Sequence, residues 1–135
     1  MKIASAKLTV IAVLSFFSLH ASAQTADLLP EVPEGAQAIS LQGETLFSAE
    51  PGDATLGNLA MAEAEFRENP DDADNIIWFG RRTAYAGDYR RAIETFSEGI
   101  DKFPDDPRFY RHRGHRYISI REFDRAITDF EIAAE

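Results

Sequence analysis

The sequence predicts an all-α fold built from consecutive antiparallel helix pairs, and three observations lead to this prediction. When the chain is aligned on itself with Pro70 placed on Pro104, segment 70–101 matches segment 104–135 at nine of 32 positions, and a fixed period of this size indicates a repeat architecture. Within each unit, apolar residues recur at spacings of three and four, which is the helical pattern. Glycine and proline separate these stretches and mark the ends of the helices.

Each repeat is predicted to contain two helices. In the first repeat, 70–103, the helices cover about 74–86 and 89–102, and Gly87-Asp88 forms the turn between them. The second repeat, 104–135, follows the same plan and is cut short at the C-terminus. A small residue on one helix lets the axis of its partner approach closely, so Gly80 and its counterpart Gly114 are expected where helices cross.

Paired carboxylates follow the proline that opens each repeat. Asp71-Asp72 and Asp105-Asp106 are expected to start the next helix, because anionic side chains stabilise a helix N-terminus.

A lone helix is predicted over 53–69, before the first repeat. Asp53 is the expected N-cap, Leu56, Leu59 and Phe66 form an apolar stripe, and Asn69-Pro70 ends the helix, since the residue before proline is pushed out of the helical region. Residues 24–52 form an acidic, mostly irregular leader interrupted by proline and glycine. This leader either docks on the folded part through a short apolar cluster or remains a tether.

The first 23 residues have the order of a secretory signal peptide. Two lysines precede an apolar run from Leu8 to Leu19, and Ala21-Ser22-Ala23 supplies the small residues before cleavage at Ala23/Gln24. A membrane anchor is the alternative, but such a helix needs about 20 apolar residues. The mature protein is therefore expected to be exported, periplasmic or secreted, without membrane insertion after cleavage.

Composition excludes several function classes. The 135 residues contain no cysteine, which rules out disulfides, cysteine-bound zinc, iron–sulfur clusters and a cysteine nucleophile. Fourteen basic residues against 23 acidic ones give a net charge of −9, which argues against nucleic acid as a partner. The charge is uneven, because residues 24–75 carry 12 acidic and one basic residue, whereas residues 76–135 carry 11 of each.

The repeated residues resemble the tetratricopeptide repeat (TPR) pattern. The first copy is Ile76-x2-Phe79-Gly80-x2-Thr83, followed by Gly87-Asp88-Tyr89, Ala92-x3-Phe96 and Pro104, and the second copy is Tyr110-x2-Arg113-Gly114-x2-Tyr117, followed by Phe123, Ala126 and Phe130. The resemblance covers 70–135 well and 53–69 weakly. It implies a TPR-like α-solenoid of about two to two and a half repeats that acts as a protein-binding scaffold. The run 110–117 is also similar to one in bacterial exported TPR proteins.

In the TPR family the first helix of each pair lines a concave, peptide-binding groove. Carried over by position, the resemblance implies a lining of Asp74, Ile77, Trp78, Arg81, Tyr85, Arg108, Arg111, His112, His115 and Ser119. Guanidinium groups match carboxylates with two parallel hydrogen bonds, so the expected partner is a protein or peptide that is acidic or carboxylate-ended. Alternatively, the arginines form a solvated face that balances Asp105, Asp106, Glu122 and Asp124.

Arg113 departs from the family pattern because it occupies a position that is usually apolar. An unpaired buried charge is costly, so the guanidinium must be paired or must reach solvent. Asp105, Asp129 and the acidic N-terminal half are the candidate partners, and a later repeat or a partner protein is the alternative.

His112 and His115 lie three positions apart, a spacing compatible with two metal ligands. Four neighbouring arginines, Arg108, Arg111, Arg113 and Arg116, would repel a divalent cation, so no metal site is predicted. No nucleophile motif or glycine-rich phosphate loop accompanies the pair, so the chain is predicted not to be an enzyme and to need no cofactor. The alternative function is a module that binds or hydrolyses a phosphorylated small molecule through His112, His115 and the nearby arginines.

Two further hypotheses concern the ends of the repeat array. Stacked repeats need about three units and a capped end, and the helix ending at Glu135 would leave an apolar face open. We therefore expect a piece of a longer array, or self-association through this helix. The five carboxylates of residues 27–50 suggest that the leader folds back over the Arg/His helix.

Overall fold

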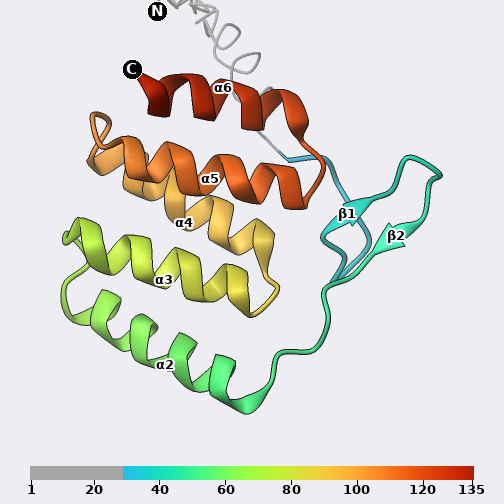
Figure 1. Ribbon diagram of the computed structural model, residues 1–135. Coiled ribbons are helices and arrows are strands. Elements are labelled where there is room, and N and C mark those ends of the chain that lie inside the picture. Colours follow the sequence, from blue (N-terminus) through green and yellow to red (C-terminus); the bar gives the residue numbers. More distant parts are fainter. Residues whose placement is uncertain (1–28) are drawn as a thin grey trace, which may run out of the picture. The chain divides into compact units, whose positions relative to one another are not determined.

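The computed structural model describes residues 29–135, and Val32–Glu135 form one unit of the chain (Figure 1). The signal peptide and the cleavage site predicted over residues 1–23 lie outside the described residues.

Five helices follow one another in this unit (Figure 1). They are α2 (Asp53–Glu68), α3 (Ala73–Tyr85), α4 (Tyr89–Lys102), α5 (Pro107–Ser119) and α6 (Phe123–Ala134). Each helix packs on the next one, and α3 also contacts α5. Two short strands, β1 (Ala38–Ile39) and β2 (Thr45–Leu46), pair antiparallel before the first of these helices. The architecture confirms the predicted all-α, TPR-like helical repeat.

Aspartates begin three of the helices. Asp72 accepts a hydrogen bond from the backbone N–H of Asn75, Asp88 from that of Arg91, and Asp106 from that of Arg108. These bonds satisfy backbone donors that have no partner within the helix. The predicted helix-starting role of the two carboxylate pairs is therefore confirmed for their second members, Asp72 and Asp106.

The start of α2 differs from the prediction. Gly52 occupies the N-cap position without a side-chain hydrogen bond, and Asp53 is the first helical residue. The helix begins one position earlier than expected because the backbone carbonyl of Gly52 already accepts bonds from the N–H groups of Thr55 and Leu56. Asp53 still lies in the first turn, where its negative charge is favourable.

The predicted apolar stripe of α2 is only partly covered. Ala62 is the buried residue of this helix, and Phe66 stacks on Phe79 of α3 with ring centroids 5.0 Å apart. Leu56 is exposed, so its assignment to the covered stripe is wrong. Helix α2 packs chiefly against one helix, α3. One neighbouring helix covers a narrower face of α2 than two neighbouring helices would.

Glycines allow close packing within both helix pairs. A Cβ added to Gly80 would lie 2.6 Å from the Phe96 ring, and one added to Gly114 would lie 2.9 Å from the Phe130 ring. Both distances are shorter than a normal carbon–carbon contact of about 3.5–4.0 Å. The expectation that these glycines lie where helices cross is confirmed.

The leader docks on the helices through the segment that contains the two strands. The side-chain carbonyl of Gln37 accepts hydrogen bonds from the backbone N–H groups of Tyr89 and Arg90, at 2.9 and 3.3 Å. The Ser48 hydroxyl donates to the backbone carbonyl of Gly87. Docking is therefore observed, but it uses these polar contacts, and the apolar cluster predicted to carry it is largely open to solvent, since Leu41 is 85% and Phe47 is 64% exposed. The contacts are with the start of α4, so the hypothesis that the leader covers the Arg/His helix α5 is wrong for these residues.

Candidate functional site

A hollow of about 220 Å³ lies between the first helices of the two repeats. Its lining is Arg81, Tyr85, Phe96, His112, His115 and Arg116. We call it the Arg/His pocket. Four of these residues belong to the predicted groove, and Phe96 and Arg116 do not. The helical spacing of four positions between His112 and Arg116 could have identified Arg116 as a neighbour on the same face.

The α3 wall of the pocket is an arginine held between aromatic rings. The Arg81 guanidinium donates a hydrogen bond to the Tyr85 hydroxyl at 3.2 Å and lies 4.3 Å from the centre of the Trp78 ring. This hydrogen bond lowers the pKa of Tyr85. Stacking on aromatic faces orients a guanidinium while its remaining N–H groups stay available.

The α5 wall contributes a histidine that remains neutral. His112 stacks on Phe96 with ring centroids 5.6 Å apart. Burial, followed by the positive charges of Arg111 and Arg81, lowers the pKa of His112 to about 4. At neutral pH the imidazole is therefore uncharged and can donate one hydrogen bond and accept another.

Arg116 is partly removed from water on the same wall. Its guanidinium lies 5.7 Å from the centre of the Tyr89 ring, and burial lowers its pKa. Within residues 29–135, no carboxylate lies within ion-pair distance of Arg81, Arg111 or Arg116. The pocket therefore presents arginines from two helices without an anion supplied by the described part of the chain.

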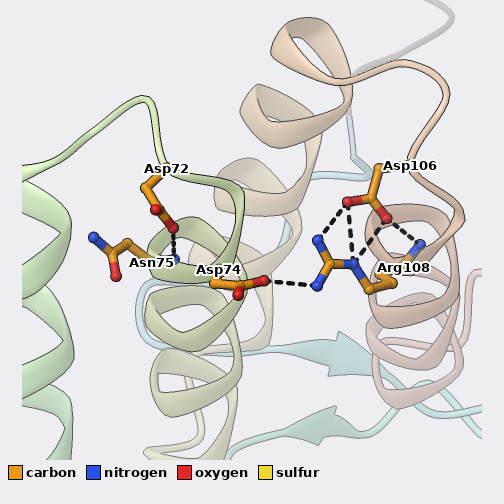
Figure 2. A network of polar contacts seen from close by, with 5 residues as sticks. All are labelled: Asp72, Asp74, Asn75, Asp106 and Arg108. Atoms are coloured by element: carbon orange, nitrogen blue, oxygen red, sulfur yellow. Dashed lines mark hydrogen bonds and ion pairs between the residues drawn. The ribbon is translucent and has the colours of Figure 1, made fainter.

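Arg108, in contrast, is already paired (Figure 2). Its guanidinium binds Asp106 at 2.7 Å and Asp74 at 2.6 Å, which joins the start of α3 to the start of α5. The side-chain hydrogen bond from Arg108 lowers the pKa of Asp106, and the hydrogen bonds with Asp106 and Asp74 raise the pKa of Arg108. Arg108 therefore follows the alternative prediction, in which acidic side chains of the same chain balance the arginines. Its partners are Asp106 and Asp74, and not Asp105.

The other predicted lining residues lie in different surroundings. Trp78 and Arg111 are exposed on the surface, and the Ser119 hydroxyl donates to the backbone carbonyl of His115. Ile77 is buried in the core beside Phe96 and Phe109, so its assignment to the groove surface is wrong. Its neighbour Ile76 is buried as well, because helices pack on two sides of α3.

Arg113 forms a buried ion pair with one of its candidate partners. Its guanidinium donates to both carboxylate oxygens of Asp129, at 2.9 and 2.8 Å, and to the Ser97 hydroxyl at 3.0 Å. Asp129 is 2% exposed. The pair joins α5 to α6, so the prediction that Arg113 is paired is confirmed for Asp129.

Residues 29–135 contain no group of three or more histidine or acidic side chains placed to hold an ion.

None of the helices described over residues 29–135 is both long and apolar enough to cross a membrane.

Similarity to known proteins extends over half of the chain. The chain is 33% identical over 67 residues to tetratricopeptide repeat protein 12 of Homo sapiens, and the same figures hold for that of Mus musculus. The match covers 50% of this chain and 10% of each relative, so the chain spans about a tenth of the length of these relatives. No model of a known protein family matches the chain. The similarity supports a TPR-like protein.

Proposed function

We propose that this protein is a non-enzymatic scaffold that binds an acidic or carboxylate-ended peptide of a partner protein in the Arg/His pocket. One observation carries the proposal: Arg81 and Arg116, on two neighbouring first helices, line one hollow without a carboxylate partner among the described residues. Two arginines held by different helices fix the direction from which an anion approaches.

The chemistry of the pocket suits a carboxylate. A guanidinium offers two parallel N–H groups to the two oxygens of a carboxylate, and such charge-assisted bonds are stronger than neutral ones. Burial disfavours the charge of Arg116, and an anion bound beside it would offset that cost. The neutral His112 adds a hydrogen-bond donor without adding charge.

The size of the pocket favours a peptide over an enclosed small molecule. Sites that enclose small ligands usually measure about 300–1,000 Å³, whereas this hollow measures about 220 Å³. It accepts one acidic group and leaves the rest of the ligand on the surface. The phosphorylated small molecule of the alternative function would bind with its phosphate alone.

Isothermal titration calorimetry at low salt tests this function. The probes are a ten-residue peptide with aspartate next to a free C-terminal carboxylate, the same peptide with asparagine and a C-terminal amide, and inorganic phosphate. We expect the acidic peptide to bind and the neutral one to bind at least about tenfold more weakly, because a hydrogen bond to a charged group contributes about 1.5–3 kcal/mol.

Two variants locate the binding. Arg116→Gln should weaken binding of the acidic peptide by about tenfold or more. Arg67→Gln, which removes an exposed arginine of α2 far along the sequence from the pocket, should not change it. Equal loss in both variants would reject the pocket as the site, and binding of phosphate but not of the peptide would favour the alternative function.

Export is a second part of the proposal and rests on residues 1–23 alone. The order of charged, apolar and small residues is that of a signal peptide, which would place the scaffold in the periplasm or outside the cell. Expression of the full chain in a bacterium should give a periplasmic protein whose first residue is Gln24. Retention in the cytoplasm with an intact N-terminus would reject it.

Self-association through α6 is proposed as a third part. This helix exposes Phe123 and Ile127, which lie four positions apart and therefore on one face, and an exposed apolar patch favours contact with another surface. Sedimentation velocity over a range of concentrations should show a dimer that Ile127→Ser weakens. A monomer at all concentrations would reject it.

A further inference from the structure

Reciprocal contacts fasten the leader to the start of α4. The side-chain carbonyl of Gln37 accepts hydrogen bonds from the backbone N–H groups of Tyr89 and Arg90, and the Arg90 guanidinium donates to the backbone carbonyl of Gln37 at 3.3 Å. The flanking residues Ala36 and Ala38 are each 3% exposed. One leader residue, Gln37, is therefore held at the first turn of the helix.

Gln37 completes the cap of α4. The first backbone N–H groups of a helix have no acceptor within the helix, and the side chain of the N-cap residue Asp88 accepts a bond from that of Arg91. The two N–H groups before it, those of Tyr89 and Arg90, bind Gln37. Release of the leader would leave these two groups to water and would remove part of the support of the first turn.

The Tyr89 ring connects this cap to the Arg/His pocket. The ring is partly buried and packs against the core, and the Arg116 guanidinium lies 5.7 Å from its centre, which is within the range of a cation–π contact. Arg116 is one of the two arginines that line the pocket. The leader therefore reaches the pocket through two successive contacts, from Gln37 to the backbone of Tyr89 and from the Tyr89 ring to Arg116.

We propose that the leader is an allosteric strap for the Arg/His pocket and that Gln37 is its positioning residue. When the leader is docked, the capped first turn of α4 holds the Tyr89 ring beside Arg116. When the leader is released, this turn frays and Arg116 loses the support of the ring, so the pocket binds its anion more weakly. The inference rests on the proposed function and names how that site is regulated.

The coupling acts in both directions. If docking of the leader raises the affinity for the peptide by some factor, bound peptide favours docking of the leader by the same factor. We expect a factor of about five, at the low end of the usual range for coupled sites. The factor is small because the leader acts on one of the two arginines, and through an intermediate ring.

Calorimetry with the acidic ten-residue peptide measures the first direction. Gln37→Met removes the acceptor oxygen while keeping the length of the side chain, and it should weaken binding about fivefold. Gln42→Met makes the same change at an exposed glutamine of the leader, between β1 and β2, and should leave the affinity unchanged. Gln37→Glu keeps an acceptor for both N–H groups and should restore most of the affinity.

A double variant tests the route through Tyr89. Tyr89→Leu removes the ring beside Arg116 and should itself weaken binding of the peptide. If Gln37 acts through this ring, Gln37→Met combined with Tyr89→Leu should cause no further loss of affinity. Independent losses that multiply in the double variant would show that Gln37 acts by another route and would overturn the strap.

Amide hydrogen exchange measures the second direction. The N–H groups of Tyr89 and Arg90 bind the leader, so their exchange reports directly on its release. Saturating peptide should slow their exchange about fivefold in the original protein. In Gln37→Met both amides should exchange fast with or without peptide, while protected amides in the middle of α3 show that the variant is folded.

The outcomes separate the strap from the proposed function. Equal affinities in Gln37→Met and Gln42→Met, or exchange at Tyr89 and Arg90 that does not respond to the peptide, would overturn the strap and leave the proposed function standing. Failure of the original protein to bind the peptide would reject both.

Discussion

The two repeats use the same backbone for different chemistry. Phe79 and Thr95 of the first repeat correspond to Arg113 and Asp129 of the second. The first pair is buried and carries no charge, and Phe79 stacks on Phe66 of the preceding helix. The second pair is an ion pair that joins α5 to α6. The same two positions of a helix pair therefore hold uncharged residues in one repeat and an ion pair in the other.

The exposed positions differ in the same way. Trp78 and Arg81 of the first repeat correspond to His112 and His115 of the second. The first repeat therefore carries an indole and a guanidinium at these positions, and the second repeat carries two imidazoles beside Arg116. The contrast teaches that the repeat fixes where these positions lie, whereas the individual side chains decide the chemistry that each position offers.

The largest predicted effect comes from breaking the ion pair of the second repeat. Asp129→Thr leaves the Arg113 charge buried without this carboxylate and should cost about 3–5 kcal/mol of unfolding free energy. The double change Arg113→Phe with Asp129→Thr installs the residues of the first repeat and should restore most of this loss. Urea unfolding of the two single variants and the double variant measures the coupling, and purely additive losses would contradict the equivalence of the two pairs.

The next effect compares the glycines at the two helix crossings. Gly80→Ala places a methyl group 2.6 Å from the ring of Phe96, and that ring is 1% exposed and closely surrounded. Overpacking of this kind costs about 1–3 kcal/mol and should exceed the gain in helix propensity of about 1 kcal/mol. Gly114→Ala meets the less buried Phe130 near the end of the helix stack, so it should be close to neutral. Thermal unfolding measures the stability of both variants. Equal losses of stability in Gly80→Ala and Gly114→Ala would contradict the prediction and would mean that the two crossings are equally rigid.

The histidine at the Trp78-equivalent position gives a pH-dependent effect. The folded pKa of His112, about 4, lies below the ordinary value of 6.5, so the unfolded chain takes up a proton more readily. Its contribution to stability is therefore present above pH 6.5 and is lost as the pH falls from 6.5 through 4. After allowance for solvent screening the loss is about 1–2 kcal/mol.

His112→Gln isolates this effect. The stability difference between the original protein and this variant should change between pH 7 and pH 4.5 in favour of the variant. His115→Gln, a change of the same kind in an exposed neighbour, is the control. Parallel pH profiles for the original protein and His112→Gln would contradict the role of His112.

The smallest effect concerns the turns. Gly87 has a φ of 90°, and Arg121 takes the corresponding position with a φ of 67°. A side chain in this left-handed region costs about 1–2 kcal/mol, part of which glycine returns as greater freedom of the unfolded chain. Arg121→Gly should therefore stabilise the protein by about 0.5–1 kcal/mol. Chemical denaturation provides the measurement, and a loss of stability would show that Arg121 makes contacts that outweigh its backbone strain.

Much of the helical plan could be predicted from the sequence because it depends on local signals. The period of apolar residues, the aspartates after Pro70 and Pro104 and the repeated glycines each act within one or two turns. The exact residue at an element end is not fixed by these signals, and Gly52 rather than Asp53 takes the N-cap of α2. The observed start of α2 differs from the predicted start by one residue. A helix begins where a backbone carbonyl accepts the first helical hydrogen bonds, and here that carbonyl belongs to Gly52.

The candidate site could be predicted only in part, because it depends on contacts between distant residues. The resemblance to the TPR pattern placed Ile77 on the groove surface. Whether helices pack against α3 on one side or on two sides depends on tertiary contacts, which the sequence pattern does not show. The sequence pattern could not decide which arginines are paired. Arg108 finds Asp74 at the start of α3, and Arg113 finds Asp129 on the next helix. Arg81 and Arg116, which have no ion-pair partner among residues 29–135, define the pocket.

The division of the arginines into paired and available groups is the central claim, and side-chain nuclear magnetic resonance tests it most directly. The Nε–Hε signals of the arginines are followed while the acidic ten-residue peptide is added at low salt. The account predicts saturable shifts for Arg81 and Arg116, and no shift for Arg108 and Arg113, which already bind carboxylates of their own chain. Shifts at Arg108 and Arg113 with none at Arg81 and Arg116 would contradict it.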